Sequence, residues 1–412
     1  MRCVLHIGTE KTATTTIQDF VYANRDALQA QRIGLSTVLG HPNNRSLAAY
    51  FQTRFDDYFK DRRIATEEEK AAYFATFLDD FRAEVAGQSS CDTYFITSEH
   101  FHSRMTDEAE IQALKDYLGT LFSEIKVVCY FREQSAVVRS LYSTAITVGQ
   151  SGEFQGFARR ATPDAHYYNY ALFFSKWANV FGRENVVARL YDRKAFVDGD
   201  IRKDILRQIR GDIDLSAFDY ARDNSNKSLG RVGIELGRIV NKTYPRYRPD
   251  GSINKLRVRL MHEIVRSDIA GLGTVAAPQA RDIYDVFDPS NREFAKAFLN
   301  MDGNPFPPPK QDDAGSGTDN LDNEQLLAMV FDFFRSVLSR AINDTPLEDS
   351  YASLLREVAV KAETGAPVTL QEGKDLLEMA IRVRPTGVFL KKKHGEYSRA
   401  LTEKAEEGAG ES

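Results

Sequence analysis

A lysine and a cluster of threonines follow the first apolar run of the sequence, in the stretch VLHIGTEKTATTT (residues 4–16). A helix N-terminus offers unpaired N–H groups and the positive end of the helix dipole, so cationic and hydroxyl side chains there favour a bound anion. A threonine-capped helix with a solvated lysine is the plainer alternative, but a cap needs only one hydroxyl. The side chains predicted to contact the anion are those of Lys11, Thr12, Thr14, Thr15 and Thr16.

The nucleoside-triphosphate loop is the obvious comparison, but its spacing differs. That loop reads G-x-x-x-x-G-K-[ST], with the lysine directly after the second glycine. Here Lys11 comes three residues after Gly8, and Ala13 occupies the place of the second glycine. A triphosphate bridged by a metal ion is therefore not favoured.

A second motif could hold a phosphate group. In VVCYFREQSAVVRSLY (residues 127–142), Arg132 follows an apolar strand pattern, and Ser140 comes eight residues later in a helical pattern. Eight helical residues turn about 800°, which leaves Ser140 only about 80° around the axis from Arg132. A guanidinium fork and a hydroxyl at these positions can share one phosphate. A surface arginine and an unrelated helix serine are the alternative for this motif taken alone.

Together the two motifs resemble the phosphosulfate-binding loop and the 3′-phosphate site of sulfotransferases, especially the bacterial and carbohydrate-acting branches. That family has a strand, then Pro-Lys-Ser/Thr-Gly-Thr-Thr, then a helix. This sequence departs from the pattern at Glu10 and Ala13, where proline and glycine are usual. Glu10 adds negative charge near the anion unless it turns outward. Ala13 resists positive φ angles, so we expect a loop conformation that alanine tolerates.

The resemblance implies a donor, a reaction and a set of binding residues. The donor is 3′-phosphoadenosine 5′-phosphosulfate, the product is adenosine 3′,5′-bisphosphate, and no metal is required. The acceptor is a hydroxyl or amine, and we favour a carbohydrate hydroxyl over another small molecule. A nucleotide-dependent phosphotransferase and a noncatalytic nucleotide- or glycan-binding module remain alternatives. The nucleotide-binding residues that the resemblance implies are Lys11, Thr12, Ala13, Thr14, Thr15, Thr16, Arg132 and Ser140.

The reaction also needs a stabilised leaving group and a general base. Lys11 is placed to offset negative charge on the departing phosphate oxygen, where one preorganised donor contributes about 3–4 kcal/mol. The stretch YFITSEHFH offers Glu99 and His100 as bases, and strand alternation would put only one of them in the cleft. Sulfotransferases use either residue type, and we favour Glu99 because a Ser-Glu pair here recurs in the bacterial branch. His102 is predicted to lie at the surface, and His6 in the core.

The elements that must position these residues alternate along the first half of the chain, which favours an α/β fold with a parallel central sheet flanked by helices. The resemblance assigns this fold to the P-loop-like sulfotransferase class. Ligands in such sheets bind beyond the carboxyl ends of the strands. The predicted strands are Cys3–Ile7, Ile33–Val38, Thr93–Thr97, Lys126–Phe131 and Val186–Leu190, and the predicted helices between them are Thr15–Gln31, Thr66–Ala86, Asp107–Phe122, Gln134–Val148 and Tyr168–Phe181.

The later part of the sequence is predicted to be mostly helical. Weaker similarity to bacterial sulfotransferases continues to about residue 300 and includes Asn224–Gly230. We therefore expect a sulfotransferase domain over residues 1–300, a flexible linker rich in proline and glycine over 301–320, and a helical extension over 321–412. The extension is predicted to end in a solvated charged tail that includes Lys391–Lys393. The predicted helices are Gly230–Asn241, Arg281–Leu299, Glu324–Ala341, Pro346–Lys361 and Gln371–Ile381.

Composition narrows the class of protein. The 412 residues carry a formal net charge of -5, which does not favour a nucleic-acid-binding surface. The three cysteines match no metal-ligand spacing and suggest free thiols in a reducing compartment. The sequence has no signal-peptide pattern and no apolar run long enough to span a membrane, so we expect a cytoplasmic protein. The aromatic stretch His166–Trp177 could line a sugar groove, but a packed helix is the favoured reading.

Overall fold

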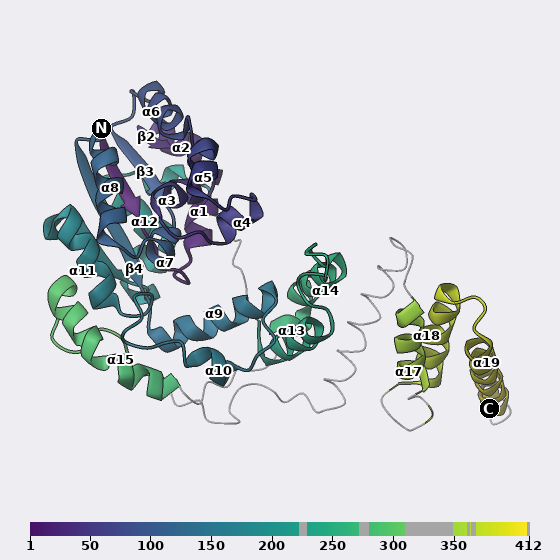
Figure 1. Ribbon diagram of the computed structural model, residues 1–412. Helices are drawn as coiled ribbons and strands as arrows, with labels where there is room; N and C mark the ends of the chain where they lie inside the picture. The colour runs from purple at the N-terminus through teal and green to yellow at the C-terminus, as the bar shows by residue number, and fades with distance from the viewer. Residues whose placement is uncertain (222–228, 272–279, 310–348, 361–362, 364–367, 410–412) are drawn as a thin grey trace. The chain divides into compact units, whose positions relative to one another are not determined.

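The computed structural model describes residues 1–221, 229–271, 280–309, 349–360, 363 and 368–409 (Figure 1). The chain divides into two compact units. The first unit is Met1–Ala145, Gly152–Ser228 and Val275–Asp312, and the second is Ile146–Ser151, Leu229–Thr274 and Asp313–Ser412. Most of the predicted linker and the predicted helix Glu324–Ala341 lie outside the described residues, as does most of Asn224–Gly230.

The first unit contains a five-stranded sheet in which all the strands are parallel. The strand order is β2-β3-β1-β4-β5, so β1 lies at the centre and its carboxyl end is flanked by those of β3 and β4. Short runs of apolar residues that are buried on both faces are typical of strands in such sheets. The predicted α/β fold with helices around a parallel sheet is thus confirmed. The strands are β1 Arg2–His6, β2 Ile33–Leu35, β3 Thr93–Thr97, β4 Glu124–Phe131 and β5 Val186–Leu190.

Successive residues of β1 point into two separate cores. Val4 packs with apolar side chains of α1 and α12 on one face of the sheet. Leu5 packs with α8 and α11 on the opposite face, where Trp177 is fully buried. This alternation follows from the two-residue period of a strand. The helices of the first unit are α1 Thr14–Ala23, α2 Arg25–Ala30, α3 Arg45–Phe51, α4 Asp57–Asp61, α5 Glu67–Tyr73, α6 Phe77–Gly87, α7 His100–Arg104, α8 Glu108–Gly119, α9 Gln134–Val148, α10 Phe154–Ala158, α11 Tyr170–Phe181, α12 Ile201–Ile209 and α15 Ala280–Phe294, and the last residues of α9 belong to the second unit.

Two of the predicted helices are interrupted. Thr15–Gln31 is two helices, α1 and α2, that meet at Asn24. The Asn24 side chain donates to the carbonyls of Phe20 and Asp219, so a contact distant in sequence fixes this break. Thr66–Ala86 is likewise divided into α5 and α6. The periodicity marked the helices correctly but not their ends.

The second unit is helical where it is described. Its helices are α13 Arg231–Thr243, α14 Lys255–Arg266, α17 Asp349–Val360, α18 Leu370–Val383 and α19 Val388–Ala409. Residues of α17, α18 and α19 share a small core that includes Leu377 and Tyr397. Of the predicted solvated segment Lys391–Lys393, which lies in α19, Lys391 and Lys392 are exposed. Lys393 is half-buried and pairs with Glu363 at 2.7 Å and with Glu396 at 2.9 Å. No helix within the described ranges is long and apolar enough to cross a membrane.

Candidate active site

The predicted anion-binding loop leaves β1 at the centre of the sheet and stays attached to β4. The Thr9 amide donates to the Tyr130 carbonyl at 2.9 Å, and the Tyr130 amide donates to the Gly8 carbonyl at 2.7 Å. Gly8 has φ 109°, and a Cβ there would lie 3.3 Å from the Glu99 Cα. Both its conformation and the close approach of the β3 end therefore favour glycine.

The turn into α1 uses left-handed backbone conformations. Ala13, the residue before the helix, has φ 60° and ψ 31°, and Lys11 has φ 67°. The expectation that the loop avoids positive φ at Ala13 is thus wrong. The left-handed conformation costs a residue with a Cβ roughly 1–2 kcal/mol. Ala13 provides no side-chain cap, so the first N–H groups of α1 are not capped from that position.

Lys11 and Arg132 are brought together at the carboxyl edge of the sheet. The Arg132 Nη1 donates to the Lys11 carbonyl at 3.1 Å, and its guanidinium lies 5.4 Å from the centre of the Tyr191 ring. The Lys11 ammonium donates to the Thr144 hydroxyl at 2.7 Å. Burial, and then the charge of Arg132, lower the pKa of Lys11 against the opposing effect of nearby carboxylates. The Arg132 guanidinium thus lies against the Lys11 backbone, and positive charge from both residues in this region favours an anion.

Ser140 lies one helical turn before Thr144, on the helix that Lys11 contacts. The Thr144 hydroxyl donates to the Ser140 carbonyl at 3.2 Å within α9. Residues four apart share a face of a helix. The two predicted phosphate motifs are therefore joined by contacts of Lys11 with Thr144 and of Arg132 with Lys11, and these last two residues are 121 apart in sequence.

The four threonines of the loop differ in what their hydroxyls do. Thr12 is fully buried, and its hydroxyl donates to the Thr9 carbonyl at 2.6 Å, so it stabilises the loop itself. Thr14 is buried, Thr15 is exposed and Thr16 is half-buried. In the part of the chain that the structure describes, the hydroxyls of these three make no hydrogen bond. The Thr12 hydroxyl is therefore already used within the loop.

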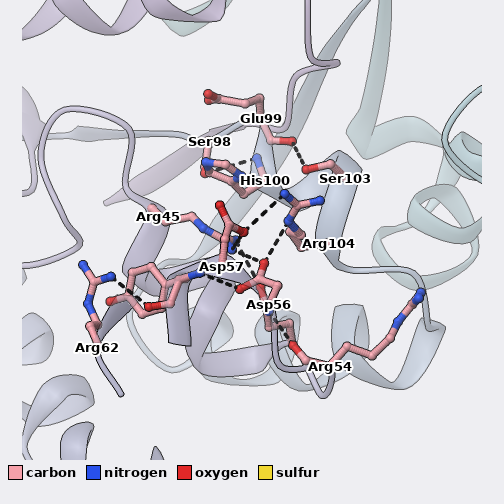
Figure 2. Close-up of polar contacts among 12 residues, drawn as sticks. Arg45, Arg54, Asp56, Asp57, Arg62, Ser98, Glu99, His100, Ser103 and Arg104 are labelled. Carbon is pink, nitrogen blue, oxygen red and sulfur yellow. Dashed lines mark hydrogen bonds and ion pairs between the residues drawn. The ribbon is translucent and has the colours of Figure 1, made fainter. Parts of the chain in front are cut away.

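The two candidate bases point in different directions (Figure 2). β3 ends at Thr97 and Glu99 directly precedes α7, so the strand alternation assumed from the sequence does not reach these residues. The Glu99 carboxylate accepts a 2.6 Å hydrogen bond from the Gln18 side chain of α1. The imidazole of His100 lies on the side of Arg45 and Arg104, whose charges both lower its pKa.

Electrostatics also separate the two candidates. Burial raises the pKa of Glu99, the nearby Glu10 carboxylate adds to the rise, and Gln18 and Lys11 oppose it. Burial, and then the charge of Arg45, lower the pKa of His100 to about 3. A base with so low a pKa accepts a proton poorly near neutral pH, whereas a raised pKa improves a carboxylate as a base.

Beside His100 lies a network of ion pairs (Figure 2). Arg45 pairs with Asp56, and the Arg104 Nε lies 2.8 Å from the same carboxylate. Asp57 lies 3.5 Å from Arg104. The Asp56 carboxylate thus offsets the charges of two arginines, and these contacts hold α3, α4 and α7 together beside His100.

Glu10, where the sulfotransferase pattern has proline, is held in a closed set of hydrogen bonds. Its backbone N–H donates to His102 Nδ1 at 3.4 Å, and its carboxylate accepts from the Tyr167 hydroxyl at 2.7 Å. His102 Nε2 lies 2.9 Å from the Tyr167 carbonyl. Because Nδ1 accepts a hydrogen bond from the Glu10 N–H, Nε2 carries the imidazole hydrogen and donates to that carbonyl. These three residues fix the position directly before Lys11.

Sequence reasoning missed this set of contacts. His102 is 1% exposed rather than at the surface, and burial lowers its pKa to about 4. Burial alone would raise the pKa of Glu10, but hydrogen bonds from Ser103 and Tyr167, with the nearby histidines, outweigh it and lower the pKa. Glu10 is therefore ionised. The feature of the sequence that indicates these contacts is the aromatic stretch after residue 165. Most of this stretch packs in the core, as predicted, but the Tyr167 hydroxyl contacts Glu10 of the loop.

Several other predictions can be compared with the structure. His6 is fully buried in the core and contacts Thr97 at 2.8 Å, as predicted. The three cysteines are unpaired and buried. Among the described residues, no group of three His, Cys, Asp or Glu side chains is arranged to hold a metal ion.

A cavity of about 310 Å³ adjoins the loop along the outer side of α1. Thr16 and Phe20 of α1 line one side, and His41, Pro42 and Asp219 line the others. Its lining extends along α1 from Thr16, in the first turn of the helix, to Asn24 at the C-terminal end. Its lining combines an aromatic ring with carboxylates and a histidine, which suits a flat polar ring more than an anion.

Known proteins show only partial similarity to this chain. No protein-family model matches the sequence. A curated relative, an uncharacterized protein of Archaeoglobus fulgidus, is 26% identical over 133 residues, which are 32% of this chain and 34% of the relative. The chain thus spans about a third of the length of that relative. The crystal structure of a sulfotransferase from Alicyclobacillus acidocaldarius aligns with 46% of this chain and 72% of its own, at 19% identity and a TM-score of 0.29. At this TM-score the likeness carries no conclusion about activity.

Proposed function

We propose that the protein transfers a sulfuryl group from 3′-phosphoadenosine 5′-phosphosulfate to an acceptor hydroxyl. The observation that carries this proposal is the contact of Arg132 with the Lys11 carbonyl at the carboxyl edge of the sheet, beside the start of α1. It brings the cation of one sequence motif against the backbone of the lysine of the other motif. A donor with one phosphate at each end of its ribose needs two anion sites at short range.

Each part of the donor has residues that suit it. Lys11 and the N–H groups at the start of α1 would hold the 5′-phosphosulfate, because a helix N-terminus binds phosphate. Arg132 and Ser140 would hold the 3′-phosphate, since a guanidinium fork matches phosphate geometry. The cavity beside Thr16 would take the adenine ring, with carboxylates such as Asp219 to accept hydrogen bonds from its amino group.

The transfer breaks one bond and forms one. The acceptor oxygen attacks sulfur in line with the bond from sulfur to the 5′-phosphate oxygen. As that bond breaks, its electron pair goes to the phosphate oxygen, and the bisphosphate leaves. Lys11 and the first N–H groups of α1 offset the charge that develops there.

Glu99 would remove the proton of the acceptor hydroxyl. Its pKa is raised by burial, and Gln18 fixes its orientation. A base in hydrogen-bond reach of the reacting proton typically contributes 10²–10⁴-fold to the rate. His100 is directed elsewhere and has its pKa lowered to about 3, which disfavours it as the base.

The acceptor that we propose is a carbohydrate hydroxyl, in a protein of the cytoplasm. The support is the likeness of the Lys11 loop to those of carbohydrate-acting enzymes of this type. A test incubates the full chain with labelled donor and a panel of glycans, phenols and amines, in the presence of EDTA. We expect a product heavier by one sulfuryl group. Turnover of ATP that requires magnesium would instead assign a phosphotransferase, and donor binding without turnover would assign a binding module.

A further inference from the structure

The hairpin of α13 and α14 is strongly basic in a chain whose net charge is negative. Between Arg231 and Ser267 the sequence has nine Lys and Arg against three Asp and Glu. The whole chain carries -5. Positive charge is thus concentrated in α13, α14 and the turn between them, in the second unit; Figure 1 shows the two helices. A local excess of positive charge attracts an anionic partner even when the protein as a whole is acidic.

One of these cations stabilises the hairpin and is not available to a partner. Arg257 is 4% exposed, and its guanidinium donates to the Thr147 carbonyl at 2.5 Å and to Asn241 at 2.9 Å. The Asn241 amide in turn donates to the Ile146 carbonyl at 2.7 Å. Arg257 therefore satisfies carbonyls at the C-terminal end of α9, where a cation is favourable. The other cations of α14, Lys255, Arg259 and Arg266, are exposed.

The opposite side of α14 combines cations with exposed aliphatic side chains. The buried face of the helix contains Met261 and Ile264 in addition to Arg257. Val258 and Val265 lie on the exposed face, at 46% and 44% exposure. Positions three and four apart fall on one face of a helix. The exposed residues of this face are Lys255, Val258, Arg259, His262, Val265 and Arg266.

The turn that leads into α14 has the same character. Tyr247 and Ile253 pair across the turn and are 38% and 54% exposed. The Arg246 guanidinium lies 5.4 Å from the centre of the Tyr247 ring, and Arg248 is exposed beside it. Tyrosine, aliphatic and arginine side chains at a surface are typical of protein that rests in a lipid headgroup layer.

We propose that α14 and its leading turn dock the protein on a membrane surface that contains anionic phospholipids. The cations would contact headgroup phosphates, and the valines, with Tyr247 and Ile253, would enter the boundary with the acyl chains. A nucleic acid or an anionic glycan fits this face less well, because neither offers an apolar phase to exposed valine and isoleucine side chains. This proposal is independent of the function proposed above.

The test measures sedimentation of the full chain with vesicles. With about 30 per cent phosphatidylserine in phosphatidylcholine, we expect binding that weakens with salt, and with phosphatidylcholine alone, little binding. The variant Lys255→Glu/Arg259→Glu/Arg266→Glu should bind at least about a hundred-fold more weakly, because each cation contributes roughly five-fold. The circular dichroism spectrum of the variant should match that of the unmodified protein, which shows that the weaker binding does not come from unfolding.

A matched variant makes the same change in net charge at three positions outside this face. Arg25→Glu/Arg82→Glu/Arg159→Glu alters three exposed arginines of the first unit and should keep binding within a few-fold. Equal loss in both triple variants would overturn the proposal, because net charge and not this face would then decide binding. No binding of the unmodified chain to phosphatidylserine vesicles would overturn it too.

A second variant separates a membrane from a soluble polyanion. Val258→Ser/Val265→Ser keeps every charge and removes the aliphatic contacts. We expect it to weaken vesicle binding by about ten-fold or more, since each valine loses apolar burial. Unchanged vesicle affinity in this variant, together with tight binding of heparin or single-stranded RNA, would assign the face to a polyanion and reject the membrane.

Discussion

The Gln18 side chain of α1 donates a 2.6 Å hydrogen bond to Glu99 Oε2. Gln18 is 3% exposed and lies one turn beyond the threonines of the loop, so the helix that begins at the anion site also orients the candidate base. Glu99 in turn lies against Gly8, at the start of the same loop. The base and the anion site therefore form one rigid arrangement. A substitution at one of them should be judged by its effect on the other.

Glu99→Gln tests the base. We expect kcat to fall by about 10²–10⁴-fold while the affinity for adenosine 3′,5′-bisphosphate stays within a few-fold. In the unmodified protein kcat should rise with pH through the raised pKa of Glu99, because only the ionised carboxylate can accept the proton. The variant should lose this rise. The measurement is a pH profile of kcat with saturating donor.

His100→Ala is the control for that variant. His100 is directed toward Arg45 and Arg104, so its removal should leave the pH profile in place. A loss of turnover in His100→Ala with an active Glu99→Gln would move the role to the histidine. Normal turnover in both would mean that the base lies elsewhere.

Glu10→Gln should shift the same profile toward lower pH. The Glu10 carboxylate is ionised and contributes to the raised pKa of Glu99, so removal of its charge should lower that pKa. The glutamine can still accept a hydrogen bond from Tyr167, which keeps the loop in place. An unshifted profile with normal turnover would show that the two carboxylates do not interact. The measurement is again kcat against pH.

Much of the fold follows from local pattern. β3 and β5 have the predicted bounds, because short apolar runs that contain β-branched residues are typical of strands. Lys11 and Arg132 follow strand ends at the carboxyl edge for the same reason, since parallel strands end their apolar runs there, whereas Ser140 lies within α9. The sequence could therefore predict which residues lie near the carboxyl edge of the sheet, where the candidate site is.

The contacts inside that region could not be predicted. His102 and Tyr167 are distant in sequence, and only the packing of α7 against the segment before α11 brings them to Glu10. The left-handed conformation of Ala13 contradicts the ordinary preference of alanine, so residue type alone did not indicate it. Local pattern reports which residues are buried. It does not report which polar groups meet.

Lys11→Ala and Arg132→Ala test the anion site. Each should weaken binding of adenosine 3′,5′-bisphosphate in EDTA by about ten-fold or more, because a charged hydrogen-bond partner contributes roughly 1.5–3 kcal/mol. Arg132→Lys should recover only part of the affinity, since an ammonium lacks the guanidinium fork. Calorimetry measures the three affinities, and Arg139→Ala on the same helix serves as the comparison. Unchanged affinity in both alanine variants would remove the basis of the proposed donor site.

Gly237→Ala should destabilise the α13–α14 hairpin. A Cβ at this position would lie 2.5 Å from the Ile146 side chain and 3.2 Å from Met261, so the helices must move apart. Overpacking of this kind typically costs about 1–3 kcal/mol and exceeds the gain in helix propensity of alanine over glycine, roughly 1 kcal/mol. Gly156→Ala, with open space around its Cβ, is the control and should be neutral or slightly stabilising. Denaturant unfolding followed by circular dichroism measures both.

Buried histidines should make the first unit unstable in mild acid. Burial lowers the pKa of His6 and His102 to about 4 and of His100 to about 3, whereas an unfolded histidine titrates near 6.5. Above pH 6.5 these histidines are neutral in both the folded and the unfolded state, so they add no pH dependence to the free energy of unfolding. Below it the unfolded state binds protons that the folded state does not, so the free energy of unfolding falls as the pH falls toward the lowered values.

The expected slope is about 1.4 kcal/mol per pH unit for each such histidine. His100→Gln removes one of them, so its free energy of unfolding should fall less steeply between about pH 6 and pH 4.5. Glu99 contributes with the opposite sign, because its pKa is raised, but it is present in both proteins and cancels in the comparison. His262→Gln changes an exposed residue and should leave the slope unaltered. Urea midpoints across this range give the slopes, and parallel curves for His100→Gln and the unmodified protein would show that His100 is already protonated in the folded state.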